Sequence, residues 1–284
     1  MSFAAPEIGS FNAPDGYPLS VRRWRVERPV GEVVYLHGII SHSGWYESSC
    51  AHLARDGFNV HFIDRRGSGL NWRDRGDVRD WSVWIADVVS YLKHLPSQRP
   101  KILLGISWGG ILATAVVKQE PSLVSGLGLI CPGLCSHKAT TGLQKTLLGL
   151  AGPLGLGGCK VNIPLRDPSW FTNSSIHRKY IAEDPLTLRK ITIRFARNNI
   201  KLLAFATEVP EQVKCPVLLM LAGSDSITDN LATRALFDRF ASRKKQIYEY
   251  QGAAHTLEFE ADPAVYLRDL AGWCHGLSKQ TTSD

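Results

Sequence analysis

The 284-residue sequence lacks several features that would place it in a specialised class of protein. It has no uncharged apolar run of 18 residues, so no segment is expected to span a membrane. Residues 1–10 have neither the basic region nor the apolar stretch of a signal peptide, and we expect a cytoplasmic protein. Internal repeats and low-complexity tracts are missing as well. With 44% hydrophobic and 21% charged residues, the composition is that of an ordinary soluble globular protein.

The sequence also has no cysteine pattern typical of a metal site or a redox motif. Its six cysteines, at positions 50, 131, 135, 159, 215 and 274, include no CxxC pair. Cys131 and Cys135 are separated by three residues but have no histidine partners at zinc spacing. We therefore expect reduced, mostly buried thiols and no bound metal.

Acidic residues are scarce in one part of the chain only. The net charge is +7, and residues 134–210 hold 11 Lys/Arg against four Asp/Glu, whereas the rest of the chain holds 22 of each. A basic surface can bind nucleic acid, but no nucleic-acid motif or interleaving of aromatic and basic residues accompanies it, and we predict no nucleic-acid partner.

Short apolar runs alternate with helix-like stretches, which predicts an α/β fold with a mostly parallel sheet. A hairpin opens the chain, with strands at 8–12 and 19–26 around the turn residues Asp15-Gly16. The other predicted strands are 33–36, 60–63, 102–104, 127–130, 217–221 and 246–250, and the clearest predicted helices are 45–57, 81–95 and 110–119.

This alternation breaks after residue 130. About 80 residues pass before the next clear strand, far more than one crossover connection needs. We interpret residues 134–210 as a cap inserted into one α/β core, formed by residues 1–133 and 211–284.

The strongest local motif is GISWG at 105–109, which fits G-x-S-x-G between an apolar strand and an apolar helix. A serine at such a sharp strand-to-helix turn points outward above the sheet, and the helix N-terminus favours developing negative charge. We predict that Ser107 is a nucleophile. The alternative is a glycine-rich turn with an incidental serine.

A nucleophilic serine needs a histidine base, and the histidine needs a carboxylate. His255 follows the last predicted strand, and Asp225 follows the strand at 217–221. Asp229 is the main competitor, but it lies beyond the turn and is interpreted as an exposed helix cap. His37 and Asp64 also follow strands, and we expect both to organise loops.

Two backbone N–H groups must bind the oxygen that becomes negative during acyl transfer. One is expected from Trp108, the residue after the serine. The other is expected from Ile39, in the loop after the strand at 33–36, where Gly38 allows a close approach. An ordinary glycine turn is the alternative for this loop.

Together these motifs resemble those of monoacylglycerol lipases and related lysophospholipase-like hydrolases of the α/β-hydrolase superfamily. The segment HGIISHSGWY (37–46) is similar to their oxyanion loop, and DRRGSG (64–69) looks like their D-x-R-G-x-G loop. The likeness covers residues 10–130 and 211–275 and is weak in the cap. It implies an eight-stranded core with a lid after the sixth strand and a metal-free ester hydrolase without cofactor, and it carries the oxyanion donors over to Ile39 and Trp108.

This sequence departs from the family pattern beside the reaction centre. Ile39 replaces a small residue, Ile40-Ser41 replace Gly-Glu, and Trp108 replaces the usual methionine. The added bulk changes the acyl pocket, whereas the backbone donors remain.

We therefore expect a carboxylic ester hydrolase that cleaves lipid-like monoesters, such as monoacylglycerol or lysophospholipid. Acyl transfer or perhydrolysis by the same triad, and a non-catalytic hydrolase-fold binding module, remain alternatives. The basic residues of 134–210 and the apolar run 147–156 suit contact with an anionic membrane. Solvated helix faces around a packed cap core, or an anionic soluble substrate, explain the same pattern.

Overall fold

The computed structural model describes residues 5–137 and 154–278. Its centre is an eight-stranded sheet in the order β1-β2-β4-β3-β5-β6-β9-β10. The strands are β1 (Glu7–Asn12), β2 (Pro18–Trp24), β3 (Gly31–Leu36), β4 (Phe58–Ile63), β5 (Lys101–Ile106), β6 (Gly126–Ile130), β9 (Val217–Ala222) and β10 (Lys245–Tyr250). β2 pairs antiparallel with β1 and β4. The remaining neighbours in the sheet order, β4-β3-β5-β6-β9-β10, pair in parallel.

The predicted α/β-hydrolase fold with a mostly parallel eight-stranded sheet is confirmed. Every residue of β3, β5, β6 and β9 is buried, as expected for strands covered by helices on both faces. The predicted hairpin is present, and Gly16 in its turn has a φ of +77°, a backbone conformation that favours glycine.

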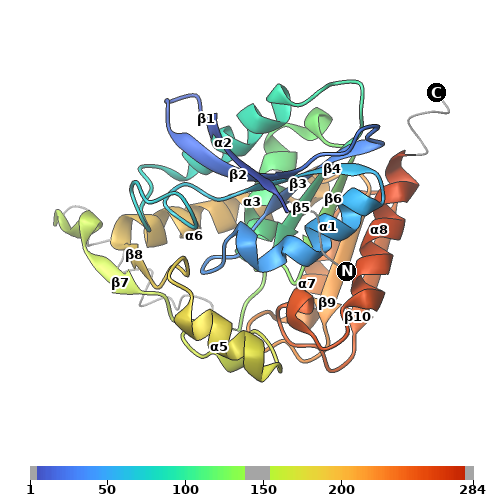
Figure 1. Cartoon of the computed structure of the whole chain (residues 1–284). Coiled ribbons are helices and arrows are strands. Elements are labelled where there is room, and N and C mark those ends of the chain that lie inside the picture. The colour runs from blue at the N-terminus through green and yellow to red at the C-terminus, as the bar shows by residue number, and fades with distance from the viewer. Residues whose placement is uncertain (1–4, 138–153, 279–284) are drawn as a thin grey trace.

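Helices cover both faces of the sheet (Figure 1), with α1 and α8 on one face and α2 and α3 on the other. The core helices are α1 (Glu47–Arg55), α2 (Trp81–His94), α3 (Trp108–Gln119), α7 (Asn230–Asp238) and α8 (Ala264–Ser278). The three helices predicted at 45–57, 81–95 and 110–119 are found with shifted ends. α1 begins two residues later than predicted because Ser43–Tyr46 forms a 3-10 turn, and α3 begins two residues earlier.

The described residues between β6 and β9 outside the sheet form the inserted cap, at the lower left of the sheet in Figure 1. In its described part the helices are α5 (Ser175–Glu183) and α6 (Ile193–Thr207), and the strands β7 (Lys160–Asn162) and β8 (Lys190–Thr192) form an antiparallel pair that we did not predict. The division of the chain at residues 134 and 210 stays a prediction. Most of the apolar run 147–156 lies outside the described residues.

Candidate active site

Ser107 lies at the turn between β5 and α3, in a backbone conformation that side chains rarely adopt. Its φ is 52° and its ψ is −119°, and such strain persists only where the surrounding structure enforces it. Backbone hydrogen bonds supply that constraint: Ser107 N–H donates to Ile130 O, and Ser107 O accepts from the N–H groups of Gly110 and Gly133. The side chain is thereby held above the carboxyl ends of the strands.

His255 lies within hydrogen-bond distance of both Asp225 and Ser107. His255 Nε2 is 2.9 Å from Ser107 Oγ, and His255 Nδ1 is 2.7 Å from Asp225 Oδ2. A carboxylate accepts, so Nδ1 carries the proton and Nε2 is left as the acceptor for the serine hydroxyl. The three predicted side chains therefore have the geometry that a nucleophile, a base and an orienting carboxylate require.

Asp225 is surrounded by hydrogen-bond donors. Its Oδ1 accepts from the N–H groups of Ile227 and Thr228, and its Oδ2 accepts from Thr228 Oγ1 at 2.6 Å as well as from His255. Burial alone raises the pKa of Asp225, but the imidazole of His255 and the Thr228 hydrogen bonds outweigh it and hold that pKa below its ordinary value. Asp225 stays ionised at neutral pH.

Thr228 is a contributor that our sequence analysis missed. Its hydroxyl shares an acceptor oxygen with His255, which fixes the carboxylate plane. A signal existed in the sequence, because a threonine three residues after an aspartate commonly bonds back to it in a turn.

Asp229 and Asp64 have structural partners, as we expected, although Asp229 is half-buried and not exposed. Asp229 is the N-cap of α7, and its Oδ1 accepts from Ala232 N–H at 2.9 Å. Asp64 accepts from the N–H groups of Ser43 and Leu70 and so joins two loops.

The loop after β3, which holds the predicted oxyanion donor Ile39, packs closely against the serine. A Cβ added to Gly38 would lie 3.3 Å from Ser107 Cβ and 3.7 Å from Ser107 Oγ, so a side chain there would crowd the nucleophile. Ile39, Ser107 and Trp108 all line the same cavity. Trp108 is the first residue of α3, where the N–H has no acceptor within the helix.

Among the described residues, Cys131, Asp225 and His255 form a group whose ligand atoms lie within 4.8 Å of one another. Both oxygens of Asp225 and both nitrogens of His255 already take part in hydrogen bonds. Cys131 is buried, and burial raises its thiol pKa well above the ordinary value, which disfavours the thiolate that binds metals. These groups are better suited to a serine–histidine–aspartate hydrogen-bond chain than to binding a metal ion.

A cavity of about 750 Å³ opens onto Ser107 between the core and the cap. Most of its lining side chains are apolar, including Ile111, Leu134, Ile163, Leu165, Ile191, Leu203 and Ile227. A volume of this size with few polar groups is typical of a site for a small apolar ligand.

Trp108 lines the cavity, and its side chain contacts α6. Its Nε1 donates to Asn199 Oδ1 at 2.5 Å, and its ring packs edge-on against Trp84 with the centroids 5.0 Å apart. The bulk that the sequence places beside the serine is therefore fixed to the cap.

Behind the His255 loop lies a buried carboxyl group, Glu258, that the sequence did not indicate. Its Oε1 accepts from Ser49 N–H near the start of α1 at 2.8 Å, and its Oε2 has no hydrogen-bond partner in the described residues. Burial raises its pKa to about 7, only partly opposed by the N–H groups of α1. The ionisable groups that influence this carboxyl or that it influences are Tyr35, Tyr46, Cys50 and Tyr266.

Glu258→Gln is expected to flatten the pH dependence of stability. From pH 4.5 to about pH 7 the folded chain keeps a proton that the unfolded chain has lost, so the free energy of unfolding falls as the pH rises through this window. The contribution is at most about 3 kcal/mol. Urea unfolding at pH 5 to 8 should show the wild-type protein losing about 2 kcal/mol more than the glutamine variant. Parallel curves would mean that Glu258 ionises normally.

The sheet order, the inserted cap and the strained serine between β5 and α3 are those of an α/β hydrolase. The sequence profile of the family described as "Serine aminopeptidase, S33" matches residues 27–262. This chain belongs to that family.

Among its relatives, the chain is 28% identical over 242 residues to "Phospholipase YtpA" of Bacillus subtilis, covering 82% of this chain and 91% of the relative. It is 25% identical to "Monoacylglycerol lipase" of Mycolicibacterium smegmatis, covering 86% of this chain and 88% of the relative. The crystal structure of Paleococcus ferrophilus monoacylglycerol lipase superposes with a TM-score of 0.82 at 25% identity, covering 92% of this chain and 98% of that structure's chain. The chain is thus a lipase- and esterase-like α/β hydrolase.

Proposed function

We propose that this protein hydrolyses carboxylic esters, and in particular lipid-like monoesters such as monoacylglycerol or lysophospholipid, through an acyl-enzyme on Ser107. The observation that carries the proposal is the largely apolar cavity of about 750 Å³ with Ser107 in its wall, where Ser107 Oγ lies 2.9 Å from His255 Nε2. An acyl chain fits such a lining, and relatives named lipase or phospholipase are consistent with it.

In this mechanism Ser107 Oγ attacks the ester carbonyl while its proton passes to His255 Nε2. The carbonyl oxygen becomes negative between the N–H groups of Ile39 and Trp108. Collapse of the tetrahedral intermediate expels the alcohol, which takes the proton from His255. Water then gives a proton to His255 as its oxygen attacks the acyl-enzyme, the carboxylic acid leaves, and Ser107 Oγ recovers its proton. Asp225 stays ionised throughout and stabilises the imidazolium. No metal or cofactor is called for in any of these steps.

A fluorophosphonate probe and a panel of esters test the proposal. The probe should label Ser107, and p-nitrophenyl esters and monoacylglycerols of graded chain length should be hydrolysed. Because the family is described as a serine aminopeptidase, aminoacyl p-nitroanilides belong in the panel, and preferential turnover of these would redirect the proposal to peptides. An unlabelled, inactive protein would favour a binding module.

Acyl transfer and perhydrolysis use the same residues and differ only in what attacks the acyl-enzyme. Added alcohol, thiol or hydrogen peroxide separates them from hydrolysis. Under our proposal the acid remains the main product, whereas a dominant transfer product or peracid would identify the alternative.

Trp108→Met is expected to shift the preference toward longer or bulkier acyl groups. The change removes the indole of a residue that lines the cavity beside the serine, together with its hydrogen bond to Asn199. The measurement is kcat/KM along the p-nitrophenyl ester series. Trp108→Phe is the control, because it removes the Asn199 bond and keeps most of the ring. An unchanged chain-length profile for the methionine variant would mean that the indole does not limit the acyl group.

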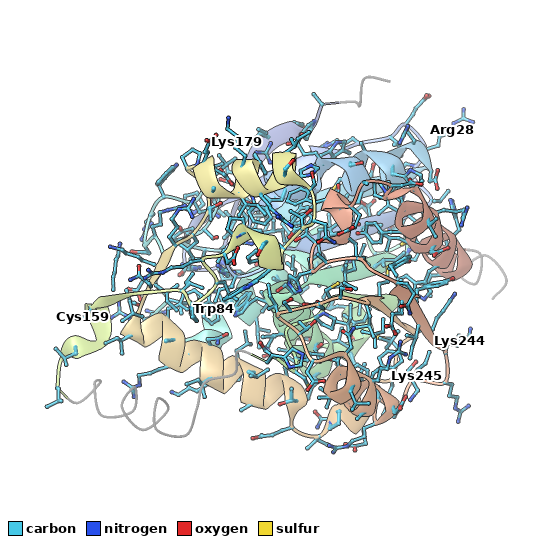
Figure 2. The ribbon with its side chains drawn as sticks, turned by 90° about the horizontal axis from the view of Figure 1, so that it is seen from below. Arg28, Trp84, Cys159, Lys179, Lys244 and Lys245 are labelled. Carbon is cyan, nitrogen blue, oxygen red and sulfur yellow. The ribbon has the colours of Figure 1, made fainter. Side chains whose placement is uncertain are left out.

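We further propose that the cap contacts anionic membrane surfaces. Leu154 and Ile176 on the cap are 70% and 78% exposed, and the basic residues Lys160 and Lys179 are exposed near them in the sequence. Figure 2 shows Lys179 projecting from α5 and Cys159 at the outer end of the cap. Each basic residue near such a surface is worth about 1 kcal/mol, screened by salt.

Binding to phosphatidylserine vesicles should therefore weaken steeply between low and physiological salt, with little binding to neutral vesicles. Lys160→Glu with Lys179→Glu should weaken it further, whereas Arg28→Glu, an exposed charge change outside the cap, should have less effect. Equal binding to both vesicle types, or binding to neither, would contradict membrane contact.

A further inference from the structure

Arg65 is a buried cation beneath the loop that we propose as half of the oxyanion hole. It occupies the variable position of the D-x-R-G-x-G-like loop and is 6% exposed. Its Nη2 donates to Ile39 O at 3.0 Å and its Nη1 to Gly38 O at 3.4 Å, while its Nε has no partner in the described residues. The neighbouring Arg66, in contrast, forms ion pairs with Asp15 and Asp87.

The carbonyl oxygen of Gly38 belongs to the same peptide group as Ile39 N–H. In a trans peptide the two point in opposite directions, so holding the oxygen fixes the direction of the N–H. His37 Nδ1 also lies 2.8 Å from this oxygen, and His37 Nε2 accepts from Arg65 N–H at 2.9 Å. Donors on Gly38 O polarise the peptide and make Ile39 N–H a stronger donor.

Arg65 also contacts the second residue of the oxyanion hole. Its guanidinium carbon lies 4.4 Å from the centroid of the Trp108 ring and 5.4 Å from that of Phe195 in α6. Stacking of a guanidinium on an aromatic face is favourable. One side chain thereby joins the loop after β3, the start of α3 and the cap helix.

Within residues 5–137 and 154–278, Arg65 forms no ion pair with a carboxylate at 4.0 Å or less, and the Asp64 carboxylate only partly opposes the effect of burial on its pKa. Burial lowers its pKa to about 9, so the guanidinium remains protonated at neutral pH. A buried cation without an ion-paired carboxylate is costly to retain, and the carbonyl oxygens of Gly38 and Ile39 are the acceptors that its Nη atoms contact there.

We infer that Arg65 is a positioning residue of the oxyanion hole, which orients and polarises the Gly38–Ile39 peptide and holds Trp108 beside it. This inference rests on the proposed function. Because the guanidinium acts through the loop and is buried behind it, it should affect the transition state and leave ground-state binding of the acyl chain largely unchanged.

Arg65→Met tests this inference, because methionine keeps an apolar stem without donors or charge. The matched control is Arg75→Met: Arg75 also donates to two carbonyl oxygens, of Gly69 and Leu186, and lies 4.4 Å over a tryptophan ring, but it does not contact the Gly38–Ile39 peptide. The active sites of each variant are titrated with a fluorophosphonate. Rates are then given per site that reacts with the probe, which we call a competent site.

Two inhibitors separate the transition state from the ground state. An alkyl trifluoromethyl ketone adds to the serine and places a negative oxygen in the hole, whereas the secondary alcohol of the same chain length binds without an adduct. For Arg65→Met we expect kcat/KM and trifluoromethyl ketone affinity to fall together by about 10- to 100-fold. Alcohol affinity should stay within about twofold, and Arg75→Met should change each quantity by less than about threefold.

Arg65→Lys keeps the charge with fewer donors, and we expect it to recover part of the loss. If the methionine variant does not fold, Arg65→Lys serves as the test, and a wild-type kcat/KM and ketone affinity in that variant would overturn the inference.

Two results for a folded methionine variant would also overturn the inference. One is an unchanged kcat/KM per competent site, and the other is an equal loss of ketone and alcohol affinity. A wild-type protein that neither reacts with the fluorophosphonate nor turns over any ester overturns the proposed function, and the inference with it.

Discussion

Ser107→Ala is expected to abolish acyl-enzyme formation while the protein stays folded. The serine hydroxyl is the only side-chain group that the proposed mechanism uses as a nucleophile, and its Oγ accounts for the hydrogen bond to His255. His255→Ala and Asp225→Asn should each lower kcat by roughly 10³-fold or more, because the base is then lost or held in the wrong tautomer. Kinetics on a p-nitrophenyl ester and labelling by a fluorophosphonate measure these losses, and circular dichroism checks the fold.

Asp229→Asn is the matched control for the carboxylate. Asp229 lies four residues after Asp225 and lines the same cavity as Ser107, but it caps α7 and has no hydrogen bond to His255 among the described contacts. We expect near wild-type kcat and a small loss of stability, about 1 kcal/mol or less. Full activity in Asp225→Asn together with an inactive Asp229→Asn would transfer the orienting role to Asp229.

Gly109→Ala is expected to destabilise the protein strongly, although it adds a single methyl group. The added Cβ would lie 2.1 Å from Leu36 O and 2.9 Å from His37 O, both of them backbone atoms of β3 and the loop that follows it. These atoms cannot move without separating α3 from the sheet, so we expect a loss of about 3 kcal/mol or more in the free energy of unfolding. Any folded fraction should also react slowly, because the serine and the Ile39 loop are forced apart.

Gly272→Ala provides the comparison, since it makes the same change within a helix. Gly272 lies in α8 with no atom within 4 Å of an added Cβ, and alanine there should stabilise the helix by roughly 0.5–1 kcal/mol. Urea unfolding of both variants measures the difference. An equal, small effect at the two positions would mean that α3 has more freedom against β3 than its close packing implies.

The local sequence predicted those parts of the site whose causes are local. A G-x-S-x-G motif between an apolar strand and an apolar helix located Ser107, because the glycines and the change in hydrophobic period are both visible in the chain. Asp225 and His255 were located because each follows a predicted strand, and parallel strands bring their carboxyl ends to one edge. Asp229 could be interpreted as a helix cap because it follows the turn and precedes a helix-like stretch.

Other features depend on segments far apart in the chain and were not visible in it. In the sequence Arg65 is one of two adjacent arginines in a loop, and only the packing of the β3 loop, Trp108 and Phe195 around it makes it a buried cation. Glu258 is likewise an ordinary glutamate until α1 covers it. The β7–β8 pair is too short for a periodic pattern to reveal.

By itself, then, the sequence determined the order of the eight core strands and three of the core helices, and it predicted an insertion after residue 130 and the chain positions of serine, aspartate and histidine. These follow from hydrophobic periodicity and turn residues, which act over a few neighbouring positions. The tertiary structure decided the shape of the cavity beside Ser107, the contacts of the Gly38–Ile39 peptide and the ionisation of buried groups. Each of these depends on which distant side chains exclude water from a given atom, and burial of that kind is a property of packing.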